Sequence, residues 1–200
     1  MRRDQTGKNA TLSIVARCSI AELMEPIETA RLRLRELEPE KDAAFLLEAL
    51  NDPAFVQNVG DRGLRTTAAA AEYIRERLAP SYRQFGFGMW LVELRETTEP
   101  IAICGLLKRE TLVDVDIGFT FLERFRAKGY AFEAASAVMD YAWNVAKLSR
   151  IIAITAAHNA SSKRLLEKLG LRFERMVRLT PDAPEIMLFA IERNPSVDRA

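Results

Sequence analysis

Residues 113–134 read VDVDIGFTFLERFRAKGYAFEA, and this stretch contains a strand, a short turn and the start of a helix. Apolar and polar residues alternate up to residue 121, which is the pattern of a β-strand with one buried face. One face carries Val113, Val115, Ile117, Phe119 and Phe121, and the other carries Asp114, Asp116, Gly118 and Thr120. Beyond the turn, apolar residues recur every three or four positions, which predicts an amphipathic helix: Phe132, Ala135, Met139, Ala142 and Ala146.

The turn between this strand and this helix has the composition of an anion-binding site. The first N–H groups of a helix lack partners within it, and the helix dipole makes this end positive. Gly129 allows close approach of a ligand, Ala131 is small, and Arg126 and Lys128 add positive charge. Many helices begin with one glycine and two basic residues, so composition alone also fits an ordinary helix start. The turn is neither a Walker loop nor a G-x-G-x-x-G motif.

The flanking sequence predicts an α/β layer with a mixed, mainly antiparallel sheet. Before the central stretch we expect a strand within 27–37, a helix over 41–50, a helix from Thr66 or Thr67 to a stop at Pro80, and paired strands over 88–94 and 100–108. After it we expect a buried strand over 151–155, a helix that ends at Gly170, and closing strands over 171–177 and 185–192.

The composition describes one ordinary globular domain. The chain has 200 residues, of which 48% are hydrophobic and 28% charged, so it can bury a core as a single unit. We assign residues 27–193 to this domain. Residues 1–26 are expected to form a poorly ordered N-terminal extension, and residues 194–200 a C-terminal tail.

Charge, cysteine and histidine content exclude several classes of function. The 29 basic and 28 acidic residues nearly cancel, so we expect neither nucleic acid nor a membrane surface as a partner. Two cysteines and one histidine are too few and too far apart for a zinc site or a disulfide framework. We therefore expect no metal and a reducing, cytoplasmic setting. No run of 18 residues is apolar and uncharged, which argues against a membrane-spanning helix.

Three ordered motifs resemble the GCN5-related N-acetyltransferase (GNAT) superfamily. Residues 126–131, RAKGYA, match its R/Q-x-x-G-x-G/A signature between a strand and a helix. Residues 159–170 are similar to its N-x-x-S segment followed by LEKLG. ETARLRLREL at 28–37, with NDPAFV at 51–56, is similar to the RimJ/RimL-like branch of ribosomal-protein alanine acetyltransferases. The resemblance covers about residues 27–193 and implies the GNAT acyl-CoA N-acyltransferase fold, with a seven-stranded sheet and about four helices.

The resemblance implies acetyl-CoA as the co-substrate and gives each matching residue a role. The backbone amides of residues 126–131 would bind the pyrophosphate, with Arg126 or Lys163 as charged partners of the phosphates. The pantetheine arm would lie along the 113–121 strand, and Asn159 and Ser162 would line the thiol end. The expected acetyl-CoA contacts are Phe119, Thr120, Phe121, Arg126, Ala127, Lys128, Gly129, Tyr130, Ala131, Asn159 and Ser162.

The implied reaction is direct attack of an amine on the thioester, which needs a base, an oxyanion site and an acid. Alkyl amines are largely protonated at neutral pH, so a carboxylate or an ordered water must accept a proton. The RimJ/RimL-like branch commonly has an acidic residue just before the Ile-Gly of the central strand, so the resemblance implies Asp116 as the base, acting directly or through water. Backbone N–H groups near Phe119 and Thr120 would hold the oxyanion. Many members carry a tyrosine seven residues after the motif asparagine, but this chain has Leu166 there, so Ser162 is the candidate acid. A solvated strand-face carboxylate and a serine that only caps a helix are the alternatives.

Two other functions stay open. A non-catalytic acyl-CoA-binding sensor would keep the anion site without turnover, and the missing tyrosine favours it. A nucleotide-binding interaction domain is a weaker alternative, because the chain lacks both glycine-rich nucleotide motifs. For the enzyme, the acceptor would be a protein N-terminus or a small amine. We expect it to bind between residues 51–80 and 179–185, in a monomer or homodimer.

Overall fold

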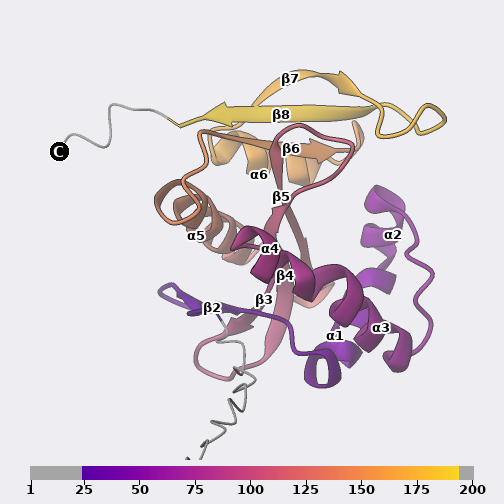
Figure 1. Ribbon diagram of the computed structural model, residues 1–200, viewed down its shortest axis with the longest axis vertical. Coiled ribbons are helices and arrows are strands. Elements are labelled where there is room, and N and C mark those ends of the chain that lie inside the picture. Colours follow the sequence, from indigo (N-terminus) through magenta and orange to yellow (C-terminus); the bar gives the residue numbers. More distant parts are fainter. Residues whose placement is uncertain (1–23, 194–200) are drawn as a thin grey trace, which may run out of the picture.

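Residues 113–134 lie at the centre of the molecule and fold as a strand, a turn and a helix. They form β5 (Val115–Phe121), the 3-10 turn η2 (Glu123–Phe125) and the start of α5 (Tyr130–Asn144). The computed structural model describes residues 24–193 (Figure 1). Most of the predicted extension, up to residue 23, and the predicted tail from residue 194 lie outside the described residues.

The sheet has eight strands in the order β1-β2-β3-β4-β5-β6-β8-β7, and its neighbours are antiparallel except for β5 and β6. We predicted seven strands. The eighth arises because residues 27–37 turn back at Thr29, whose N–H donates to the Leu32 carbonyl and whose hydroxyl accepts from the Leu32 N–H. The strands besides β5 are β1 (Ile27–Glu28), β2 (Leu32–Arg35), β3 (Met89–Leu94), β4 (Pro100–Leu107), β6 (Arg150–Thr155), β7 (Arg172–Val177) and β8 (Ile186–Glu192).

The start of β5 corrects one prediction. The strand begins at Val115, and the side chain of Val113 is 88% exposed. Its partner β4 ends at Leu107, which lies opposite Asp116, so residues 108–114 form a loop outside the sheet. The alternation of apolar and polar residues begins at residue 113, two residues before β5 starts to pair with its neighbours.

The helices between β2 and β3 differ most from prediction. They are α1 (Pro39–Asn51), α2 (Pro53–Val59), α3 (Thr67–Tyr73), the π-helical segment η1 (Ile74–Leu78) and α4 (Ala79–Phe85). Pro80 was expected to stop a helix, which is wrong. It lies in the first turn of α4, where its missing N–H has no intrahelical partner to lose. The short helices explain why the described residues contain more helical segments than the four we expected.

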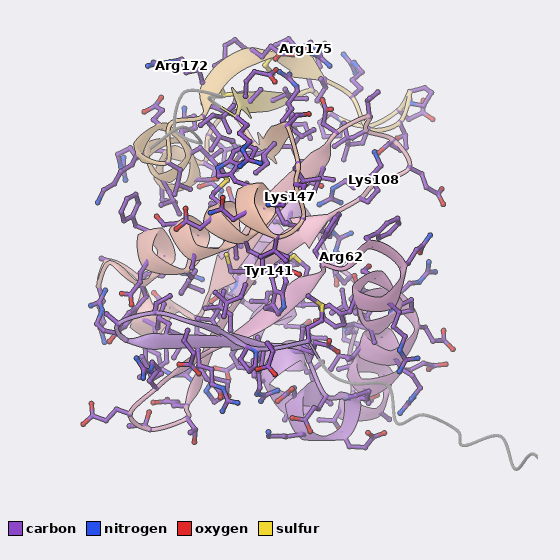
Figure 2. All side chains as sticks on the ribbon, turned by 60° about the vertical axis from the view of Figure 1, so that its left-hand side comes forward. Arg62, Lys108, Tyr141, Lys147, Arg172 and Arg175 are labelled. Carbon is purple, nitrogen blue, oxygen red and sulfur yellow. The ribbon has the colours of Figure 1, made fainter. Side chains whose placement is uncertain are left out.

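The helices cover the two faces of the sheet (Figure 1). Helix α5 packs on one face through Tyr141, whose ring meets Trp90 of β3 edge to face at 5.1 Å (Figure 2). Across the sheet Trp90 lies opposite Cys104, and Cys104 opposite Phe119, so the side chain of Phe119 faces α5 as well. Because side chains alternate along a strand, Asp116 points to the opposite face. The last helix, α6 (Ala160–Lys168), follows β6.

Candidate active site

The parallel pair β5 and β6 separates soon after it forms. Only Val115 and Asp116 pair with β6, opposite Ile151 and Ile152. Beyond them, no strand between residues 24 and 193 pairs with the edge of β5 that faces β6. The N–H of Leu122 donates to Ile101 of β4 at 3.1 Å.

The direction of the β5 backbone groups follows from that hydrogen bond. Antiparallel pairs alternate between bonded and non-bonded positions, so Thr120 directs its backbone groups to β4. Phe119 directs its backbone N–H and C=O groups toward the opposite edge of β5, which faces β6 and is called the open edge below. The structure therefore favours the Phe119 N–H over that of Thr120 as an oxyanion donor.

Residues 126–131, which we call the cradle, join β5 to α5 through two residues with positive φ. Ala127 has φ 59° and Gly129 has φ 83°. Gly129 is the N-cap of α5 and provides no capping side chain, so the first N–H groups of the helix have no capping acceptor. A Cβ at Gly129 would lie 3.3 Å from the Arg31 guanidinium, so the position is both strained for other residues and crowded. Exposed N–H groups at a helix N-terminus suit an anion such as a pyrophosphate, so the predicted role of these residues is carried forward as a proposal.

A clamp formed by Thr29, Arg31 and Glu133 holds the cradle from the side of β1 and β2. The Glu133 carboxylate accepts bonds from the Thr29 hydroxyl at 2.7 Å, the Arg31 N–H at 2.8 Å and the Arg31 side chain at 2.7 Å. Arg31 also donates to the Lys128 carbonyl at 3.2 Å and lies 4.5 Å from the centre of the Tyr130 ring. Burial tends to raise the pKa of Glu133, but the Thr29 and Arg31 hydrogen bonds outweigh it and lower the pKa.

Arg126 holds the cradle from the other side. Its Nε donates to the Phe121 carbonyl at 2.8 Å, and its Nη2 lies 2.6 Å from Asp52 Oδ1. Burial tends to raise the pKa of Asp52, but Arg126 and the N–H groups at the start of α2 lower it overall. Arg126, a predicted partner of the phosphates, thus joins the end of β5 to the start of α2 in this structure.

The positive charge predicted around the cradle is therefore partly neutralised. Arg124 pairs with Glu48 at 2.6 Å, and the Lys128 ammonium lies 5.3 Å from the centre of the Phe125 ring. Lys163, the other predicted phosphate partner, donates to the Ala157 carbonyl at 2.8 Å. This leaves the backbone amides at the start of α5 as the main candidate for binding an anion.

Two grooves border the cradle. A groove of about 650 Å³ lies toward α1 and α2 and is lined by Glu48, Asn51, Asp52, Pro53, Leu122, Glu123 and Arg124. The other, of about 580 Å³, lies along α5 and includes Arg31, Gly129, Phe132 and Lys168 in its lining. Of the cradle residues, Gly129 lines the second groove, and the first groove ends at Arg124, two residues before the cradle.

Asn159 and Ser162 lie together at the start of α6. Asn159 is the N-cap, and its Oδ1 accepts hydrogen bonds from the Ser162 N–H at 3.1 Å and the Ser161 hydroxyl at 2.9 Å. This explains the asparagine–serine spacing as a helix cap and fixes the Ser162 backbone. Leu166 is buried in the core, so no phenol occupies the position where many GNAT members have a tyrosine.

Asp116 is buried, with 1% of its surface exposed, at the point where β5 leaves β6. Burial raises the pKa of its carboxyl group, and Arg109, whose Nε lies 2.9 Å from Oδ1, acts in the opposite direction. Asp114, two residues earlier, pairs with Arg150 at 3.0 Å and is more exposed. Of the alternatives for Asp116, a solvated strand face is wrong.

Sequence reasoning missed the side chains that hold these elements. Asp52 stands before Pro53, and an aspartate followed by proline is a typical helix start. Glu133 and Arg31 lie 102 positions apart, and Arg109 lies in a loop without a motif, so no local pattern signals their contacts.

The described residues contain no group of three or more histidine, cysteine, aspartate or glutamate side chains that could hold a metal ion. Among the helices described between residues 24 and 193, none is long and apolar enough to cross a membrane.

A mixed sheet whose parallel pair opens beside an uncapped helix N-terminus is the architecture of acyl-CoA-dependent N-acyltransferases. A family profile described as the acetyltransferase (GNAT) domain matches residues 31–172. The uncharacterized N-acetyltransferase YjdG of Bacillus subtilis is 31% identical over 148 residues, which cover 72% of this chain and 88% of that protein. The chain belongs to the GNAT family of acetyltransferases, whose co-substrate is acetyl-CoA.

Solved structures show the same fold. An acetyltransferase of the GNAT family from Bacillus anthracis superposes with a TM-score of 0.70 at 24% identity, over 84% of this chain and 98% of that one. The ribosomal-protein-S5-alanine acetyltransferase from Vibrio fischeri superposes with a TM-score of 0.68 at 14% identity, over 86% and 98% of the two chains. The predicted fold class is confirmed.

Proposed function

We propose that this acetyltransferase transfers the acetyl group of acetyl-CoA to a primary amine, either a protein N-terminus or a small-molecule amine, by direct attack in a ternary complex. The observation that carries the proposal is the position of Asp116. It is a buried carboxylate at the point where β5 leaves β6, three residues before Phe119, whose backbone lies on the open edge.

The chain's own groups fit acetyl-CoA along β5. The amides of residues 126–131 at the uncapped start of α5 would hold the pyrophosphate, and the open edge at Phe119–Phe121 would hold the pantetheine arm. Ser162 and Asn159 would lie at the thiol end, held by the cap of α6. Acetyl-CoA supplies an activated acetyl thioester, so the protein needs to provide only positioning and proton transfer.

Asp116 would accept the proton of the acceptor amine, directly or through water. An alkyl ammonium group is not a nucleophile, so this proton must leave before the amine attacks. Burial raises the pKa of Asp116, which makes its carboxylate a better base than one in water. The Phe119 N–H on the open edge would stabilise the negative charge that develops on the carbonyl oxygen.

Ser162 is the proposed proton donor to the leaving thiolate. Its backbone N–H is fixed by Asn159, and Leu166 supplies no alternative hydroxyl. Leu166 also supports a second candidate function. A non-catalytic acyl-CoA-binding sensor would keep the cradle and the open edge of β5 and would lack an efficient acid.

The acceptor is proposed from resemblance rather than from a recognisable pocket. The motifs at residues 28–37 and 51–56 are similar to the RimJ/RimL-like branch, and one structural neighbour is named for acetylating the alanine of a ribosomal protein. We therefore expect peptide N-termini to be better acceptors than small amines, in a cytoplasmic enzyme that is a monomer or homodimer.

Thiol release from acetyl-CoA, measured across peptides and small amines beside a binding titration, tests the proposal. The enzyme should bind acetyl-CoA saturably and release thiol when an acceptor is present. Saturable binding without release for any acceptor would favour the sensor. Absence of binding would contradict both functions.

A further inference from the structure

Arg109 makes the closest charged contact with the proposed base. It lies in the loop 108–114 between β4 and β5, and its Nε donates to Asp116 Oδ1 at 2.9 Å. The Arg109 side chain is 29% exposed, whereas that of Asp116 is 2% exposed. The contact therefore joins a buried carboxylate to a cation that reaches it from the surface.

The other neighbours of Asp116 provide no comparable charge. Its partners across the sheet are Leu107 on β4 and Ile152 on β6, both apolar. Gly118, the next residue on the same face, has no side chain. The Asp114 carboxylate is held by Arg150 at 3.0 Å. Burial raises the pKa of Asp116, and Arg109 and, more weakly, the residue's own backbone N–H lower it, so among the described residues Arg109 is the charged group that favours its ionised form.

Lys108 is adjacent in the same loop and has a different partner. Its ammonium donates to the Val113 carbonyl, within the loop itself. It therefore offers a matched position at which one positive charge can be removed without removing the contact to Asp116.

We propose that Arg109 is a positioning residue for acetyl transfer, which keeps the Asp116 carboxylate ionised and fixed in orientation at the site of amine deprotonation. This inference rests on the proposed role of Asp116 as base. A carboxylate buried among apolar groups favours its neutral form, which cannot accept a proton. Arg109 counters that preference, so the base stays available near neutral pH while burial keeps it stronger than a carboxylate in water.

The sign of the effect follows directly. Without Arg109, Asp116 keeps its burial and loses its positive partner, so its pKa rises further. The protonated, inactive form then persists to higher pH. Removal of an opposite charge in contact with a buried carboxylate is expected to move the pKa by about one unit or more.

The experiment compares pH profiles of kcat/KM for the wild-type enzyme and the Arg109→Met, Arg109→Lys and Lys108→Met variants. In Arg109→Met the acid limb should move upward by about one pH unit or more, with activity recovered at high pH. Arg109→Lys should restore most of the shift, and Lys108→Met should leave the limb in place. A loss in Arg109→Met by the same factor at every pH would show a merely structural role and overturn the proposal.

A direct titration of Asp116 separates this inference from the proposed function. Carbon-13 NMR of the aspartate carboxyl groups, with Asp116→Asn for assignment, should show a higher pKa for Asp116 in Arg109→Met than in the wild type. An unchanged pKa would overturn the inference. A raised pKa with an unchanged pH profile would support the hold of Arg109 on the carboxylate and refute Asp116 as the base.

Discussion

At its C-terminal end β5 leads into the cradle, where backbone N–H groups, positive φ angles and exposed basic side chains meet. At its N-terminal end the same strand carries one buried carboxylate with a single charged partner. We propose that the first end binds a large anion through the main chain and that the second end accepts a proton. In the proposed reaction, binding and proton transfer are therefore separated along seven residues of one strand.

The separation explains why the chain can work with few cysteines and histidines. Backbone amides bind phosphate without any particular side chain, and one buried carboxylate suffices as a base. Each end should respond to its own substitutions and leave the other unchanged.

The largest effect is expected from Asp116→Asn. Turnover should fall about 100-fold or more because the amide cannot accept the proton of the amine. The Kd for acetyl-CoA, measured by calorimetry, should stay near the wild-type value. Asp114→Asn is the matched control, because it removes a nearby carboxylate that pairs with Arg150 instead. Equal turnover in the wild type and Asp116→Asn would remove Asp116 from the mechanism.

Gly129→Val should affect the opposite end. The side chain is strained at φ 83°, and its Cβ would crowd Arg31. A left-handed conformation costs a residue with a side chain about 1–2 kcal/mol, so the Kd for acetyl-CoA should rise about tenfold. The kcat at saturating acetyl-CoA should change little. Gly86→Val is the control: Gly86 has φ 72° with open space around it, so it should lower stability without weakening acetyl-CoA binding.

Glu133→Gln should produce the smallest effect, since it weakens the clamp and leaves the cradle in place. The Kd for acetyl-CoA should rise about threefold, because a partly exposed ion pair contributes under about 1 kcal/mol. Glu40→Gln, which breaks the exposed pair of Glu40 with Arg75, should leave the Kd unchanged. If both variants bind acetyl-CoA as the wild type does, the clamp does not position the cradle.

The clamp also predicts a pH dependence of stability. Because the folded-state pKa of Glu133 lies below its ordinary value of 4.5, its stabilisation is present above that value and is lost as the pH falls below it. The stability difference between the wild type and Glu133→Gln, followed by denaturant unfolding, should therefore shrink below pH 4.5. A pH of about 2 lies below the usual pKa range of carboxyl groups. If the stability difference between the two proteins stayed constant down to that pH, the result would contradict this prediction.

The cradle end could be predicted from sequence because local features define it. A glycine before an amphipathic helix and an alternating strand before the glycine are visible in the chain itself. The pattern also placed Asp116 opposite the face covered by α5. Its burial could not be predicted, since that depends on β6 and the loop 108–114, which come together only in the fold.

The helical region before β3 was the least predictable part. Pro80 was interpreted as a helix stop, although a proline in a first turn is equally well tolerated, and no sequence pattern distinguishes these two positions. The contact of Arg126 with Asp52 likewise joins residues 74 positions apart. Such contacts arise from tertiary packing. Sequence motifs therefore identify the residues of the candidate site better than the residues that hold them in place.

The double variant Asp116→Asn/Gly129→Val tests most directly whether the two ends of β5 act independently. We predict that the double variant has the kcat of Asp116→Asn at saturating acetyl-CoA and the acetyl-CoA Kd of Gly129→Val. The two substitutions would then act additively, without coupling. A kcat or a Kd that departs from these single-variant values by more than about threefold would show coupling beyond the usual additivity. That result would contradict the separation of binding from proton transfer along the strand.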